Sequence, residues 1–158
     1  MSIQNISKII KDKDYFVTCA ELYAKFLIVS SSLIGRITTN LHYSFGKKIG
    51  EKIIETYKPE NLNKFLEILY FLGFGKIDFI ENKKIFICKN CPISSYITKF
   101  VKTPKVKICV DFIQAGILAY GVKYFLDKNL EVEEIECKNI NKEKCVFKIF
   151  EPSSIQSV

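Results

Sequence analysis

The feature that most constrains the fold is a group of acidic and thiol side chains near the C-terminal end. Glu134, Cys137 and Cys145 fall in two apolar-rich segments, residues 130–137 and 145–150, which predict the strands of a β-hairpin. The facing ends of such strands bring distant side chains within reach of one ion. Thiolates with a carboxylate suit zinc, which favours four ligands in a tetrahedron. The sequence therefore predicts a hairpin that carries part of a metal site.

The spacing within the first of these strands predicts an irregularity. Glu134 and Cys137 are separated by an odd number of positions, so a regular strand would point them to opposite faces. The apolar pattern also changes phase, because Leu130 and Val132 belong to one set and Ile135 and Cys137 to the other. A β-bulge near residues 133–134 would explain the change and bring the carboxylate beside the thiolate.

The rest of the chain predicts an α+β fold, in which a helical layer packs on a small antiparallel sheet that includes the C-terminal hairpin. Helical spacing begins near Thr18 and continues in a second helix, whose inward stripe is Ile37, Leu41, Phe45, Ile49 and Ile53. A third helix follows Pro59, with Leu62, Phe65, Leu66 and Leu69 inward. Strands are expected at 76–81 and 84–88, and helices at 95–100 and 106–128. We expect one domain over residues 1–151 and a flexible tail over 152–158.

Composition narrows the function classes. The 158 residues are 48% hydrophobic and 26% charged, which is typical of a globular domain. The net charge is +7, but Arg36 is the only arginine, which disfavours sequence-specific nucleic-acid recognition. No apolar run is long enough for a membrane span, and the N-terminal segment lacks a secretion signal. We therefore expect a cytoplasmic protein whose six cysteines stay reduced.

The remaining cysteines leave several alternatives. Cys109 lies in the first turn of the predicted long helix, which leads into the hairpin, so it is the expected fourth ligand. Cys88 and Cys91 form a C-x-x-C pair followed by Pro92, and this pair could be metal-related, redox-active or structural. Its metal-related forms are a replacement for Glu134 or a second site.

The positions Cys109, Gly116 and Gly121, followed by the hairpin residues Glu134, Cys137, Cys145 and Phe147, give the last third of the chain a family likeness. This pattern resembles the 4-vinyl reductase domain family, which is related to vesicle transport-particle subunits and to phenol-sensing domains of bacterial activators. The resemblance implies a structural zinc held by Cys109, Glu134, Cys137 and Cys145, beside a pocket for a small aromatic or hydrophobic ligand. One departure is Asn141, where the family usually has Gly in the hairpin turn.

The resemblance suggests that the pocket is lined by Phe86, Tyr96, Phe100, Phe112 and Ile113. It favours a sensor or carrier that binds a small hydrophobic molecule and forms a homodimer. A metal held by four protein ligands has no open position for an activated water, so catalysis is disfavoured. The alternatives are a reductase-type enzyme of tetrapyrrole metabolism, for which no nucleotide fingerprint occurs, and a protein-interaction subunit.

Overall fold

The computed structural model describes residues 37–92, 95, 111–126, 130–137 and 144–152. Within them the predicted α+β fold is confirmed, because three α-helices accompany a four-stranded antiparallel sheet. The helices and strands are α3 (Ile37–Tyr57), α4 (Leu62–Phe71), β1 (Lys76–Ile80), the 3-10 helix η1 (Glu81–Lys83), β2 (Ile85–Lys89), α6 (Phe112–Leu126), β3 (Glu131–Glu136) and β4 (Cys145–Phe150). None of the described helices has the length and apolar character required to cross a bilayer.

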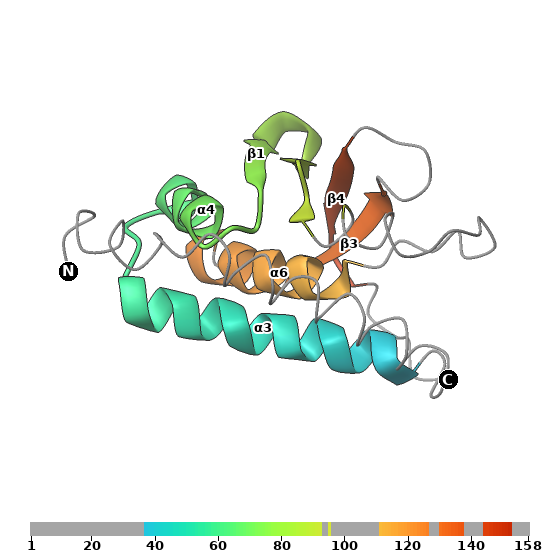
Figure 1. Ribbon diagram of the computed structural model, residues 1–158, viewed down its shortest axis with the longest axis horizontal. Helices are drawn as coiled ribbons and strands as arrows, with labels where there is room; N and C mark the ends of the chain where they lie inside the picture. Colours follow the sequence, from blue (N-terminus) through green and yellow to red (C-terminus); the bar gives the residue numbers. More distant parts are fainter. Residues whose placement is uncertain (1–36, 93–94, 96–110, 127–129, 138–143, 153–158) are drawn as a thin grey trace.

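The sheet combines both predicted hairpins in the order β1-β2-β4-β3. β1 pairs with β2, and β3 pairs with β4, as the sequence predicted. β2 also pairs with β4, in a register that places Cys88 opposite Cys145. Figure 1 shows α6 lying between the sheet and α3. Both α6 and α4 therefore contact the sheet, and α3 packs on the far side of α6, from where Tyr43 and Lys47 reach β3.

Glycines allow α3 and α6 to approach each other closely. A Cβ atom added at Gly46 would lie 2.2 Å from the carbonyl oxygen of Ile113. One added at Gly116 would lie 2.1 Å from the carbonyl oxygen of Tyr43. Because any side chain at these two positions would overlap backbone atoms, the two helix axes can be this close only with glycine at the crossing.

The predicted inward stripe of α3 is wrong in its first half. Leu41 and Phe45 are 61% and 57% exposed, and the buried residues of the helix are His42, Gly46, Gly50, Ile53 and Ile54. A strict four-residue repeat advances about 40° around an α-helix at each step, since one turn takes 3.6 residues. The stripe that faces the core at Ile53 has therefore rotated into solvent at the start of the helix.

The prediction for α4 is confirmed. Leu62, Phe65, Leu66 and Leu69 are all buried, and they join α6 and the inner face of the sheet in one core. The helix begins after Asn61, whose side-chain oxygen accepts a hydrogen bond from the backbone N–H of Lys64 at 3.0 Å.

Several predicted segments lie outside the described residues. They are the helix that begins near Thr18, most of the short helix at 95–100, the start and end of the long helix at 106–128, and residues 153–158 of the predicted tail.

Candidate metal centre

The ends of three strands, β2, β3 and β4, lie together at one end of the sheet. β4 begins at Cys145, which lies opposite Cys88 near the end of β2. β3 ends at Glu136, which lies opposite Val146, and Cys137 follows directly. The start of α6, at Phe112, lies at the same place. The preceding residue, Asp111, donates a backbone N–H hydrogen bond to the side chain of Glu134. The antiparallel topology therefore gathers cysteines from three strands beside the start of a helix.

The predicted β-bulge is present in β3. Glu134 lies opposite Phe147 and Glu136 lies opposite Val146, so Ile135 is the extra residue. Ile135 is 47% exposed, whereas Glu134 and Cys137 are 8% and 1% exposed. The bulge thus lies one residue beyond the predicted place, and it turns the carboxylate and the thiol to the same buried side.

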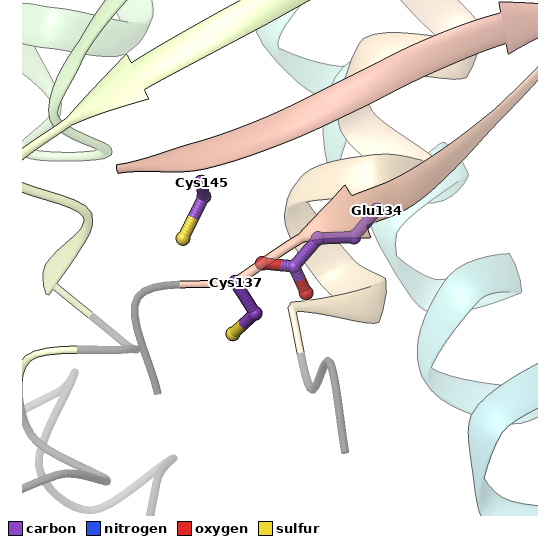
Figure 2. A group of neighbouring side chains, drawn as sticks. All are labelled: Glu134, Cys137 and Cys145. Carbon is purple, nitrogen blue, oxygen red and sulfur yellow. The ribbon is translucent and has the colours of Figure 1, made fainter. Parts of the chain in front are cut away.

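Glu134, Cys137 and Cys145 form a compact donor set. One carboxylate oxygen and the two sulfur atoms all lie within 4.8 Å of one another, and all three residues are buried. Figure 2 shows the three side chains converging from β3, its C-terminal end and the start of β4. A tetrahedral zinc at about 2.3 Å from sulfur and about 2.1 Å from oxygen requires its donors to be separated by about 3.6 to 3.8 Å. The three donors are therefore close to the arrangement that a tetrahedral ion needs.

The Glu134 carboxyl group lacks a partner on one side. Its Oε2 atom accepts the hydrogen bond from Asp111 N at 3.0 Å, but its buried Oε1 atom has no hydrogen-bond partner. Burial, together with the neighbouring Asp111 and Cys137, raises the pKa of Glu134 to about 9. A buried carboxylate oxygen without a donor is costly, and a cation is one group that removes this cost.

Neighbouring acidic groups show the same electrostatic problem. The pKa of the Cys145 thiol lies well above its ordinary value, because of its hydrogen bonds with Cys137 and Cys91 and because of burial. Burial raises the pKa of Asp111 to about 6. Several acids share one buried volume, so few can ionise together without a positive charge. A divalent cation would supply that charge, so the donor set fits zinc both in chemistry and in electrostatics.

A second pair of thiols lies beside this set. Cys88 and Cys91 are completely buried, and no disulfide joins any of the described cysteines. The Cys91 thiol donates to Oδ2 of Asp111 at 2.8 Å, and Gln114 Nε2 donates to the Cys88 sulfur at 3.3 Å. Sequence reasoning missed Asp111 and Gln114. The available signal was a capping aspartate just before an apolar helix, since Asp111 Oδ1 accepts from Gln114 N.

The structure places only some of the other predicted site residues. Cys109, Tyr96 and Phe100 lie outside the described residues. Phe86 is completely buried, and its ring stacks on that of Phe79 with centroids 4.8 Å apart. Phe112 and Ile113 begin α6, where Phe112 is half-buried and Ile113 is buried.

A cavity of about 310 Å³ lies between α3, α6 and the start of β3. It is lined by Lys47, Lys48, Glu51, Ala119, Tyr120, Lys123, Leu130 and Glu131. Among the predicted lining residues that the structure describes, Phe86, Phe112 and Ile113 do not line this cavity, so the role of the predicted lining stays a prediction.

Comparison of the sequence with known proteins gives one curated relative. No family model matches the chain. An uncharacterized protein of Methanocaldococcus jannaschii is 34% identical over 106 residues, which are 66% of this chain and 64% of that protein. The chain thus spans somewhat less than two thirds of the length of the curated relative that it matches.

Comparison of the structure gives three informative neighbours. A vinyl-4-reductase family protein from Methanocaldococcus jannaschii has a TM-score of 0.56 at 24% identity, covering 71% of this chain and 68% of that one. The phenol-responsive sensory domain of the transcription activator PoxR, solved with phenol, scores 0.57 at 11% identity, with 81% and 72% covered. A trafficking protein particle complex subunit 3 from Naegleria fowleri, covalently bound to palmitic acid, scores 0.53 at 13% identity, with 85% and 96% covered. The resemblance predicted from the sequence is confirmed by these shared folds.

Proposed function

We propose that this chain is a binding domain for a small hydrophobic or aromatic molecule, acting as a sensor or carrier, with a structural zinc ion. The observation that carries the metal part is the convergence of Glu134, Cys137 and Cys145, with Glu134 Oε1 buried and lacking a partner. The sequence predicts Cys109 as the fourth ligand, and Cys109 lies outside the described residues.

The ion would supply cross-linking rather than chemistry. Glu134 and Cys137 belong to β3 and its end, and Cys145 begins β4, so one ion would close the open end of the terminal hairpin. Asp111 N binds Glu134, and this extends the connection to the start of α6. Structural zinc adds its binding free energy to folding, and a full set of protein ligands leaves no position for an activated water.

Support for ligand binding comes from two of the structural neighbours. One was solved with phenol, and the other carries palmitic acid, so the fold accommodates an aromatic molecule in one protein and an acyl chain in another. The predicted lining residues of this chain include Phe112 and Ile113 at the start of α6, close to the metal centre. Metal binding would therefore order the element that carries part of the proposed pocket.

Native mass spectrometry tests this proposal on the purified chain. We expect one zinc ion per chain, together with a co-purified hydrophobic compound or an empty chain that accepts phenol or palmitate. Either probe should raise the unfolding temperature as its concentration rises, because binding to the native state alone stabilises it. A chain without zinc, whose unfolding temperature neither probe changes, would refute the proposal.

The assembly state and the compartment remain part of the proposal. We infer a homodimer in the cytoplasm, as the sequence resemblance suggests, with no sequence-specific nucleic-acid partner. Light scattering at increasing concentration tests the dimer, and a strictly monomeric chain would overturn that part alone.

A further inference from the structure

The thiol of Cys91 lies against the proposed metal centre from a third strand. Cys91 follows the end of β2 after Asn90, whose φ of 59° is in the left-handed region. This turn redirects the chain, and the Cys91 carbonyl then accepts hydrogen bonds from Ser95 N at 3.1 Å and Ser95 Oγ at 2.7 Å. The backbone at Cys91 is thus fixed on both sides, and its side chain is completely buried.

The Cys91 thiol connects the end of β2 to the groups around the donor set. It donates to Oδ2 of Asp111 at 2.8 Å, and Asp111 in turn donates its backbone N–H to Oε2 of Glu134 at 3.0 Å. Its sulfur also lies 3.5 Å from Oε1 of Gln114, and side-chain interactions with Cys145 and Cys88 contribute to its pKa. Cys91 is not one of the donors that all lie within 4.8 Å of one another, but it adjoins that group through Asp111 and Cys145.

The neighbouring thiol, Cys88, has a different environment. Its sulfur receives a hydrogen bond from Gln114 Nε2 at 3.3 Å and donates to the carbonyl oxygen of Phe74 at 3.5 Å. Gln114 also contacts the Cys91 thiol, with its Oε1 atom 3.5 Å from that sulfur, so the two thiols share this partner. What distinguishes Cys91 is its hydrogen bond to Asp111.

Asp111 is the other nearby donor, but both of its oxygens have partners. Oδ1 accepts from Gln114 N at 3.1 Å and so caps the first turn of α6, and Oδ2 accepts from Cys91. In the metal-free chain the Asp111 carboxylate holds the Cys91 side chain in place by accepting from its thiol. A thiolate also suits zinc better than the capping oxygen that the helix already uses.

We propose that Cys91 supplies the fourth zinc ligand, so that the ion joins β2, β3 and β4 and is held by three sulfur atoms and one carboxylate oxygen. This inference rests on the proposed metal site and changes its fourth ligand from Cys109 to Cys91. Asp111 becomes the positioning residue of Glu134 through its backbone N–H, and its carboxylate loses the hydrogen bond from Cys91 when that thiol gives up its proton to bind zinc. The ion then clamps the central hydrogen-bonded strand pair as well as the terminal hairpin.

X-ray absorption at the zinc edge tests the assignment, because zinc–sulfur and zinc–oxygen distances differ by about 0.2 Å. The full chain, loaded with zinc alone, should show three sulfur ligands and one oxygen ligand. Cys109→Ser should leave that count unchanged. Cys91→Ser should lower it to two sulfurs or lose the metal, whereas the matched variant Cys88→Ser in the same C-x-x-C pair should keep three.

The other outcomes overturn the inference in distinguishable ways. A loss of one sulfur in Cys109→Ser, with Cys91→Ser unchanged, would assign the fourth position to Cys109 and leave the proposed function standing. Two sulfurs and two oxygens in the unsubstituted chain would exclude Cys91 and leave the fourth position to an oxygen donor, either Asp111 or water. An unsubstituted chain that binds no zinc would overturn both the inference and the metal part of the proposed function. The measurements on the unsubstituted chain, on Cys109→Ser and on Cys88→Ser decide the question even if Cys91→Ser fails to fold.

Discussion

The backbone N–H of Asp111 donates a hydrogen bond of 3.0 Å to Oε2 of Glu134, across 23 residues of sequence. This contact ties the start of α6 to the bulged strand β3, and it uses one of the two carboxylate oxygens. The other oxygen, Oε1, is buried without a hydrogen-bond partner, and one oxygen of this carboxyl group lies within 4.8 Å of the sulfur atoms of Cys137 and Cys145. Glu134 thus connects the start of α6, the β-bulge and the two thiols, so a substitution at this position is the most informative one.

Glu134→Gln should weaken zinc binding by about 100-fold or more, because even residues that only orient metal ligands change affinity by about 10- to 100-fold. The matched control is Glu133→Gln, whose side chain is exposed on the same strand and should leave affinity unchanged. Competition with a chromogenic chelator measures both. Equal affinities for the two variants would show that the Glu134 carboxylate does not bind the ion.

Gly46→Ala and Gly116→Ala should each destabilise the fold by about 1–3 kcal/mol, as overpacking usually does. The added Cβ atoms would lie 2.2 Å and 2.1 Å from carbonyl oxygens of the facing helix. Gly50→Ala is the graded control, because its closest contact would be 3.0 Å. Urea unfolding measures the series, and a loss at Gly50 as large as at Gly116 would contradict the close crossing of α3 and α6.

Tyr43→Phe should cost about 1–2 kcal/mol of unfolding free energy, because the hydroxyl group makes two interactions at once. It donates to the carboxylate of Glu131 and accepts from the backbone N–H of Val132 at 3.1 Å. Tyr124→Phe on α6 is the matched control, since Tyr124 is 58% exposed. If the two substitutions have the same small effect, the Tyr43 hydroxyl does not hold α3 to β3.

The single histidine of the chain gives a pH prediction that can be followed directly. His42 is buried on α3, and desolvation lowers its pKa below the ordinary value of 6.5. The folded state therefore disfavours the charged imidazole, so stability is fully present above pH 6.5 and is lost as pH falls through the lower folded pKa.

NMR of the imidazole carbon-bound protons measures that pKa, because only one residue contributes. The unfolding free energy, measured over the same pH range, should decrease as the pH falls from 6.5 through the measured pKa of His42. A pKa at or above 6.5 in the folded chain would contradict the buried environment of His42.

Local patterns were sufficient to predict several elements. The phase change between Val132 and Ile135 indicated the bulge, because burial on one face of a strand has a strict two-residue period. The inward face of α4 and both hairpins followed from equally local signals, among them the apolar spacing from Leu62 to Leu69. These features depend on residues that are close together in the sequence, so local patterns are enough to predict them.

The neighbourhood of the metal centre could not be predicted in the same way. Cys91 lies beside Cys145 because β2 pairs with β4, and these strands are not consecutive in the chain. Strand order is decided by packing over the whole sheet rather than by any local pattern. The exposed position of Leu41 and Phe45 has a related cause, since a four-residue repeat matches the helix only over a short length.

Titration of zinc into the metal-free chain, with a competing chelator, measures whether Glu134, Cys137 and Cys145 form a structural zinc site. We expect one ion per chain with a Kd tighter than about 100 nM, as structural zinc sites bind with about 10 kcal/mol or more. Cys137→Ser should abolish that binding. Saturation with weak or multiple ions, or tight binding that survives Cys137→Ser, would contradict a structural site built on Glu134, Cys137 and Cys145.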